Sequence, residues 1–237
     1  PVLAVRWAQL PFLGAFLEPT LAFNDIGSTG EDLWPAFAQA GIKPADALSA
    51  IDGRPVASAQ DLAAALQDHA PGQTVAATVS RADGSRLEVD LSLTAFPTRS
   101  LVTYFVVPYF IGLAYLAIGL WVFVLRRGEA AGRALAVFCC ATAIALGGLF
   151  DLYTTHVFAW AWTIGIPAAG ASLITLGLVF PQEVRFAQRW PGLRLLSFLP
   201  VLALAAYALN TLYGAGVDPR AYIIAWRYEY YYMGAGI

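Results

Sequence analysis

An uncharged run from Leu101 to Leu125 constrains this chain more than any other feature of its sequence. A helix needs roughly 20 apolar residues to cross the hydrocarbon core of a bilayer, and this run satisfies that length. No soluble helix of a small domain has use for so many lipid-compatible side chains on all of its faces. The sequence therefore predicts a membrane-spanning helix over residues 101–125.

Further apolar segments predict additional spans, over residues 134–150, 157–180, 195–213 and, incompletely, 221–237. Charged residues make up only 13% of the chain, against about 25% in an average soluble domain. An apolar stretch over residues 1–22 predicts a truncated first span. The chain begins without Met and ends within an apolar segment, so we expect both ends to be cut.

Arginines predict the orientation of these spans, because Lys and Arg in short loops mark the cytoplasmic side of a membrane. Two predicted loops carry them, with Arg126, Arg127 and Arg133 in one and Arg185, Arg189 and Arg194 in the other. The alternate loops then lie outside, together with residues 23–96. We expect a multi-pass protein of a bacterial inner (plasma) membrane, with residues 23–96 in the periplasm or outside the cell.

Residues 23–96 have the composition of a soluble domain, and their turn signals follow one another closely. Asp52-Gly53 predicts a tight turn between two extended runs. Ser58 to Asp61 resembles a helix-capping box ahead of an apolar helical face. Alternating apolar residues at 74–80 and 87–93, separated by Asp83-Gly84, predict a β-hairpin with one buried face.

This order of signals resembles a bacterial PDZ domain over about residues 23–95. The matching positions lie in Gly41-Ile42-Lys43-Pro44-Ala45-Asp46 and in Ile51-Asp52-Gly53-Arg54-Pro55-Val56, with Gly41, Pro44, Asp46, Asp52, Gly53 and Pro55 as the structural motif. The chain departs from the family at Ala45, where Gly is usual, and Phe23 to Gly30 lacks a sequence like Gly-Leu-Gly-Phe. The predicted fold is an α-helical polytopic membrane protein with an inserted small α+β PDZ-like domain, residues 23–96, before a bundle over 97–237.

The resemblance implies a peptide groove, because PDZ domains add an extended peptide as a strand beside a helix. Carried over to this sequence, the groove would lie between residues 22–28 and the helix 59–68. The implied peptide-binding residues are Phe23, Ile26, Gly27, Leu62 and Leu66. The two leucines fit equally well as core residues of the small domain.

Catalytic patterns are missing from the sequence. His69 and His156 are its only histidines, so it holds no His-Glu-x-x-His zinc motif, and no Gly-x-Ser-x-Gly elbow is present. We predict no enzyme activity within these residues, no cofactor and no metal, and the lack of a basic patch argues against nucleic acid. Asp151 and His156 are candidate sensing residues at the ends of spans, although solvation at the membrane interface would also explain them.

Three functions remain open. The short inner loops and the segments Leu149-Phe150-Asp151-Leu152 and Leu178-Val179-Phe180-Pro181 resemble the input region of sensor histidine kinases. This implies a recognition module that binds a peptide or protein and transmits to a cytoplasmic output domain. The first alternative is an accessory subunit of a bioenergetic or photosynthetic membrane complex, with contacts to other subunits, lipids or a second copy. The other is a quality-control adaptor that captures exposed C-termini.

Overall fold

The computed structural model describes residues 2–26, 40–190 and 192–237, and these form two compact units. The first unit contains the described residues of Pro1–Val106 together with Phe150–Val157 and Val217–Ile223. The second contains Val107–Leu149, Phe158–Gly216 and Ile224–Ile237. The first unit thus gathers three segments that are far apart in the sequence.

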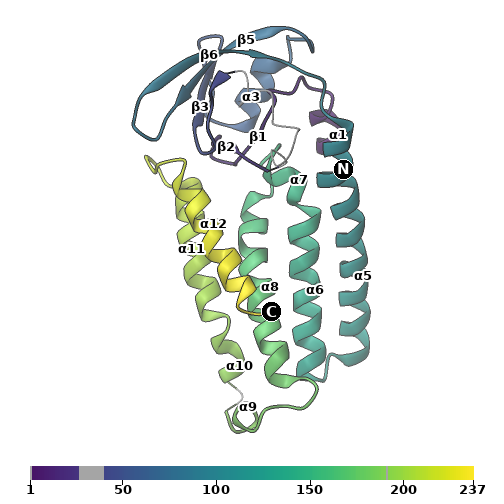
Figure 1. Cartoon of the computed structure of the whole chain (residues 1–237). Coiled ribbons are helices and arrows are strands. Elements are labelled where there is room, and N and C mark those ends of the chain that lie inside the picture. Colours follow the sequence, from purple (N-terminus) through teal and green to yellow (C-terminus); the bar gives the residue numbers. More distant parts are fainter. Residues whose placement is uncertain (1, 27–39, 191) are drawn as a thin grey trace. The chain divides into compact units, whose positions relative to one another are not determined.

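A four-stranded antiparallel sheet is the larger of the two sheets in the first unit (Figure 1). Its strand order is β4-β3-β5-β6, with β3 at Ala47–Ile51, β4 at Arg54–Pro55, β5 at Thr74–Ser80 and β6 at Arg86–Ser92. Pairs such as Val75↔Leu91 and Ala77↔Val89 fix the register of β5 and β6. The predicted hairpin is confirmed, since the apolar residues at every second position of β5 are buried.

A second, two-stranded sheet pairs β1, Phe16–Leu17, with β2, Phe23–Asn24. Two isolated bridges tie these strands to the larger sheet, Phe12↔Thr94 and Ala22↔Ala47. Glu18 is fully buried behind β1, and its carboxylate accepts a hydrogen bond from the side-chain amide of Asn24. The small sheet therefore carries its own buried polar pair.

Left-handed backbone appears where the sequence predicts turns. Asp52 and Gly53 have φ values of 49° and 73° between β3 and β4, as a tight hairpin turn requires. Ala45 has φ 70°, a conformation that disfavours any residue with a Cβ. The family usually has Gly at this position, so the departure seen in the sequence costs some stability.

Helix α3, Ala59–Leu66, begins at the predicted cap. The backbone N–H of Asp61 donates to the Ser58 hydroxyl at 3.1 Å, and the Asp61 carboxylate accepts from the backbone N–H of Ala57 at 3.1 Å. The Ser58 hydroxyl also donates to the Asp61 carboxylate at 2.8 Å. This bond first, and that from Ala57 second, lower the pKa of Asp61. The buried face of α3 consists of Ala59, Leu62, Ala65 and Leu66.

The segment over residues 1–22 corrects the sequence prediction of a first membrane span. It forms only a short helix, α1 (Val2–Trp7), and then an extended chain that ends in β1. Its apolar residues enter the core of the first unit, with Phe12, Leu13, Phe16 and Leu17 all buried. A short apolar run does not reveal by periodicity whether lipid or a protein core covers it, and here it is the protein core.

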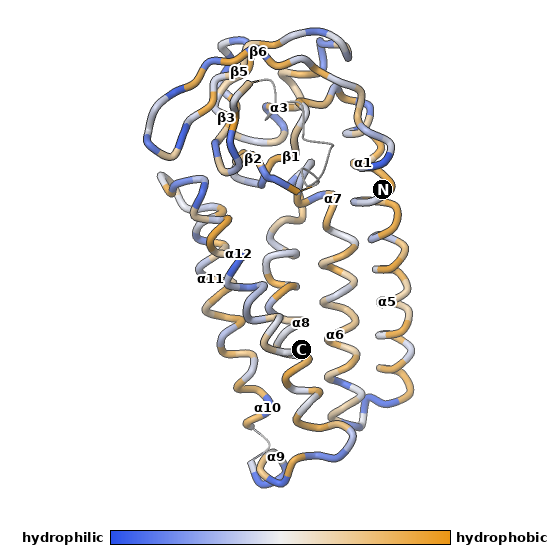
Figure 2. Tube along the Cα trace, in the orientation of Figure 1, coloured by the Kyte–Doolittle hydropathy of each residue, from blue (hydrophilic) through white to orange (hydrophobic). Residues whose placement is uncertain are grey.

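Four helices are long and apolar enough to cross a membrane, among the residues that the structure describes: Thr98–Arg126, Ala130–Gly147, Ala159–Val179 and Leu193–Tyr213. They contain α4 (Thr98–Leu101), a π-helical turn (Val102–Val106), α5 (Val107–Arg126), α6 (Ala130–Gly147), α8 (Ala159–Val179), α10 (Leu193–Leu196) and α11 (Leu199–Tyr213). Figure 2 shows hydrophobic residues along α5, α6, α8 and α11 and hydrophilic residues around α9, Arg185–Arg189. The predicted fifth span forms α12, Ala221–Gly234, whose 14 residues fall short of a crossing.

Small residues set the packing of the helical unit. A Cβ added at Gly119 on α5 would lie 2.8 Å from the Cβ of Cys139 on α6. A Cβ at Gly170 on α8 would lie 2.7 Å from the Cα of Met233 on α12. Close helix approach through small residues is typical of membrane bundles, because lipid gives apolar helices no hydrophobic reason to associate.

Candidate functional site

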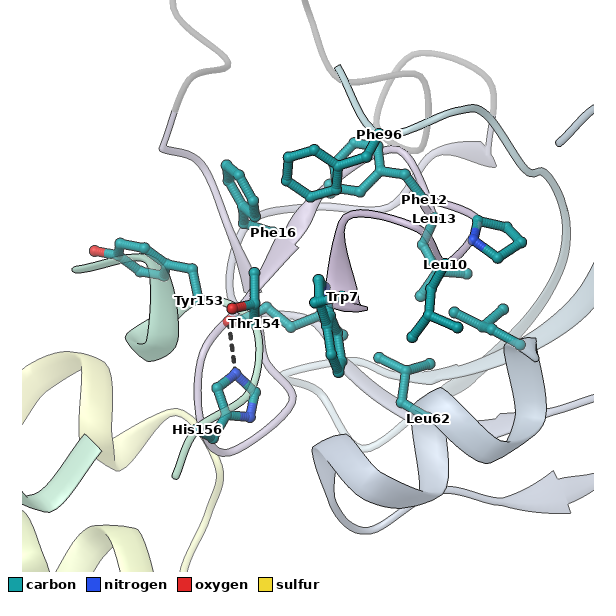
Figure 3. A pocket seen from close by; sticks show the side chains of 14 residues that line it. Trp7, Leu10, Phe12, Leu13, Phe16, Leu62, Phe96, Tyr153, Thr154 and His156 are labelled. Atoms are coloured by element: carbon teal, nitrogen blue, oxygen red, sulfur yellow. Dashed lines mark hydrogen bonds between the residues drawn. The ribbon is translucent and has the colours of Figure 1, made fainter. Parts of the chain in front are cut away.

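An apolar groove lies beside α3 in the first unit (Figure 3). One wall is the chain from Leu10 to Leu17, and another is α3 with Leu62 and Leu66. Trp7 of α1, Phe96 and the connection before α8, through Tyr153, Thr154 and His156, complete the lining. Every part of this groove belongs to the first unit.

The backbone of residues 12–17 places one open strand edge in the groove. Phe12 exchanges hydrogen bonds with Thr94 at 2.8 and 3.0 Å, and Gly14, with φ 89°, then turns the chain toward β1. The N–H of Glu18 donates to the Ala22 carbonyl at 2.7 Å, across to the β2 side. Because backbone groups alternate along a strand, the carbonyl of Leu17 points to the opposite edge, away from β2.

The connection over residues 150–157 has a fixed internal shape that Asp151 organises. The Asp151 carbonyl accepts hydrogen bonds from the N–H groups of Thr154, at 3.2 Å, and His156, at 2.8 Å. Its carboxylate accepts from the Thr155 hydroxyl and from the N–H of Val157, the latter at 3.1 Å. This segment begins in α7, Leu149–Leu152, and we call residues 152–157 the groove loop.

Aromatic contacts attach the groove loop and its neighbours to the small sheet. The rings of Phe16 and Tyr153 lie 6.1 Å apart, and Phe96 contacts Phe12, Phe16 and Phe150 at 5.2, 5.9 and 5.7 Å. Such pairs contribute about 0.5–1.5 kcal/mol each beyond the burial of their area. The ring of Phe16 is thereby held between the groove loop and the residues that follow β6.

His156 joins the groove loop to the strand edge. Its Nε2 lies 3.3 Å from the Leu17 carbonyl oxygen, and since a carbonyl only accepts, Nε2 carries the proton. Its Nδ1 is shielded from solvent and has no hydrogen-bond partner in the described parts of the chain. Burial lowers the pKa of His156 to about 4, although the bond to Leu17 opposes this shift. The imidazole is therefore neutral at pH 7.

Little space remains in the groove between these walls. The unfilled volume is about 20 Å³, which is room for about one water molecule and not for a side chain. A wider hollow of about 470 Å³ adjoins α3, between its residues Gln60, Ala63 and Gln67 and the α1 residues Leu3 and Arg6. The groove is thus filled by the chain itself.

Only some of the predicted peptide-binding residues line the groove. Leu62 and Leu66 line the groove, while their binding of a peptide stays a prediction. Phe23 is fully buried and its backbone bonds to Ala45 and Asp46, so it is a core residue away from the groove. Ile26 is not among the lining residues, and Gly27 lies outside the described residues. Among the described residues, the strand that lines the groove beside α3 is β1. Peptide binding at residues 22–28 stays a prediction.

The predicted structural motif fits the turns around the sheet. Gly41 has φ 66°, Asp46 accepts a hydrogen bond from the N–H of Lys43 at 2.9 Å, and Asp52 accepts one from the N–H of Ala76 at 2.8 Å. Pro55 pairs with Ala50, and Pro44 stands between Lys43 and the left-handed Ala45. Asp151 and His156 both belong to the connection before α8, and of these two only His156 lines the groove, together with Leu62 and Leu66.

Sequence reasoning missed two features. The segment from Leu10 to Leu17 was assigned to lipid, although Gly14 after Phe12-Leu13 signals a turn within it. In the second unit, Glu229 on α12 is fully buried, and its carboxylate oxygens have no hydrogen-bond partner among the described residues. The Nε1 of Trp226, one turn earlier, is likewise without a partner there, and its ring contacts Tyr230 at 5.4 Å.

The geometry of the first unit places a strand edge, β1, beside a helix, α3. Residues 34–93 match the PDZ domain family, so the chain contains a PDZ domain over this range. PDZ domains are non-catalytic modules that bind peptides or proteins. No curated protein matches the chain. The groove strand β1 lies ahead of the matched range, which explains why the family motif alone did not locate it.

Proposed function

We propose that the chain is a recognition module of a bacterial inner (plasma) membrane, in which the PDZ domain binds a peptide or protein segment on the extracytoplasmic side. The observation that carries the proposal is the edge of β1. Its Leu17 carbonyl points into a groove whose other wall presents Leu62 and Leu66. An incoming strand would pair with this edge and insert alternate side chains against α3.

The membrane part of the proposal rests on composition and on the arginine distribution. Four described helices are long and apolar enough to span a bilayer. Arg126 ends α5, Arg127 follows it, and Arg185 and Arg189 follow α8. By the positive-inside rule these arginines support a cytoplasmic side for both connections. The groove loop and residues 217–223 connect the opposite ends of these helices. In this function the bundle transmits groove occupancy to a cytoplasmic output domain.

An accessory subunit of a bioenergetic or photosynthetic complex is the alternative, with the PDZ domain as a clamp on a neighbour. Large apolar side chains on α5 favour contact with lipid or other subunits, since Phe110, Trp121 and Val124 are 65%, 70% and 73% exposed. Purification in a mild detergent separates the two functions. Stoichiometric co-purification of other subunits would support the accessory role.

Peptide binding is the direct test. The full chain in lipid nanodiscs is titrated with a fluorescent library of peptides that have free C-termini. We expect micromolar binding that Leu66→Ala weakens about tenfold, as expected when a buried leucine contact worth about 1.4 kcal/mol is lost. Leu91→Ala is the matched control, because Leu91 is as buried as Leu66, at 2% exposure each, yet lies outside the groove. Equal loss in both variants would attribute the effect to stability and reject the groove.

A further inference from the structure

The groove loop forms one wall of the groove and contacts the strand edge with which a peptide would pair. The Leu17 carbonyl is the group that an added strand would use, and in this structure it accepts its hydrogen bond from His156. Tyr153 and Thr154 line the same groove as Leu62 and Leu66 and are 7% and 1% exposed. With about 20 Å³ unfilled, the groove cannot hold the loop and a peptide together.

The loop has hydrogen bonds of its own, separate from its contacts with the groove. Asp151 holds it through backbone and side-chain hydrogen bonds that involve Thr154, Thr155, His156 and Val157. His156 has φ 58°, a left-handed conformation that turns its side chain within this bonded frame. A segment that is already ordered loses little conformational entropy when it enters the groove, which makes it an effective competitor.

We propose that the groove loop, residues 152–157, is an internal ligand of the PDZ domain, which an external peptide must displace. This inference rests on the proposed function, because it assumes that the groove binds peptides. The loop is part of the same chain, so it competes at a high effective concentration. If it fills the groove about nine-tenths of the time, it weakens external binding about tenfold.

Displacement is measured by thiol labelling of the full chain in nanodiscs. Cys139 and Cys140 are replaced by Ala, and Thr154→Cys places one thiol on the buried part of the loop. We expect slow reaction with a maleimide that accelerates at least tenfold when the tightest peptide of the library is added. Glu88→Cys is the control, since Glu88 is exposed on β6, outside the groove loop, and should react at one rate with or without peptide. Peptide binding with no change in the labelling of Thr154→Cys would overturn the inference.

Release of the loop supplies the second measurement. In Tyr153→Ala/His156→Gly the ring contact and the hydrogen bond are lost, while Gly tolerates the positive φ of position 156. We expect this variant to bind the same peptide about tenfold more tightly than the wild type. Tyr207→Ala, on α11 in the second unit, should leave the affinity unchanged.

The failures of the two proposals are distinguishable. Equal affinity in the wild type and the loop-release variant would reject the internal ligand and leave peptide recognition standing. If no peptide binds either chain, the proposed function fails, and the internal ligand fails with it.

Discussion

Each unit contains a buried glutamate, and the two side chains have different surroundings. In the PDZ unit, Glu18 accepts from Asn24, Asp46 accepts from the N–H of Lys43, and Asp151 organises the groove loop. In the helical unit, Glu229 and the Nε1 of Trp226 are shielded without a hydrogen-bond partner among the described residues. A buried polar group stabilises only when it is paired. Removing Glu18 should therefore lower the free energy of unfolding of the first unit. Removing Glu229 should raise the free energy of unfolding of the second.

The largest effect is expected at Glu18. Glu18→Ala leaves the buried Asn24 amide without its carboxylate acceptor, which costs about 1–3 kcal/mol. The cavity left by the removed side chain adds to this cost. Hydrogen exchange of the β5 and β6 amides measures the stability of the PDZ unit separately from the helices. Glu88→Ala, at an exposed position of β6, is the control and should change protection little. Unchanged protection in Glu18→Ala would show that the hydrogen bond between Glu18 and Asn24 does not stabilise the first unit.

Acid should destabilise the PDZ unit through His156. Its pKa is about 4 in the folded chain, against about 6.5 unfolded. Between these values the unfolded chain binds more protons, so stability is fully present above pH 6.5 and is lost as the pH falls toward 4. We expect a loss of about 2 kcal/mol, discounted for the partial exposure of the residue. His156→Asn accepts the positive φ but does not titrate, and its unfolding free energy should lack this part of the pH dependence.

Glu229→Met should stabilise the helical unit by about 1–3 kcal/mol, because it replaces an unpaired buried carboxyl with an apolar side chain of similar length. Thermal unfolding in detergent, followed through the helical signal, measures the change. Trp226→Phe removes the indole Nε1–H, which also has no hydrogen-bond partner among the described residues. This substitution should stabilise the helical unit too, by a smaller amount. Destabilisation by Glu229→Met would show that the carboxyl has a partner in the folded protein.

The smallest effect is expected at Ala45. Ala45→Gly relieves a φ of 70°, which should stabilise the PDZ unit by about 1 kcal/mol. Ala64→Gly, on the exposed side of α3, is the same substitution in right-handed helix and should destabilise by about 1 kcal/mol. Denaturant unfolding of both variants would reveal opposite shifts of the midpoint. Shifts of the same sign would refute the assignment of strain to Ala45.

Turns, helix caps and strand alternation could be predicted from the sequence, because each depends on residues that are close together in the chain. The turns at Asp52-Gly53 and Asp83-Gly84, the cap at Ser58 and the alternation of β5 are all found in the structure. The apolar helices Thr98–Arg126 and Ala130–Gly147 likewise follow from length and composition alone. In each case, neighbouring residues contain the whole explanation.

The groove could be predicted only in part. Leu62 and Leu66 were found because a helical face repeats locally. The opposite wall, residues 10–17, was not predicted. A short apolar run such as Phe12 to Leu17 is compatible both with a membrane span and with a protein core. The contact between His156 and Leu17 joins residues 139 positions apart, and no local pattern encodes such a pairing. The burial of Glu229 likewise depends on packing against α8, which the sequence does not disclose.

The walls of the groove come from segments that are far apart in the sequence. The family match covers residues 34–93, but one wall of the groove precedes it and another lies in the connection ahead of α8. Exchanging residues 34–93 with those of another PDZ domain would therefore bring in a helix α3 shaped for different walls. Recognition by this chain must change by matched substitutions in all three segments, so its specificity should evolve more slowly than that of a PDZ domain whose groove lies within one continuous stretch.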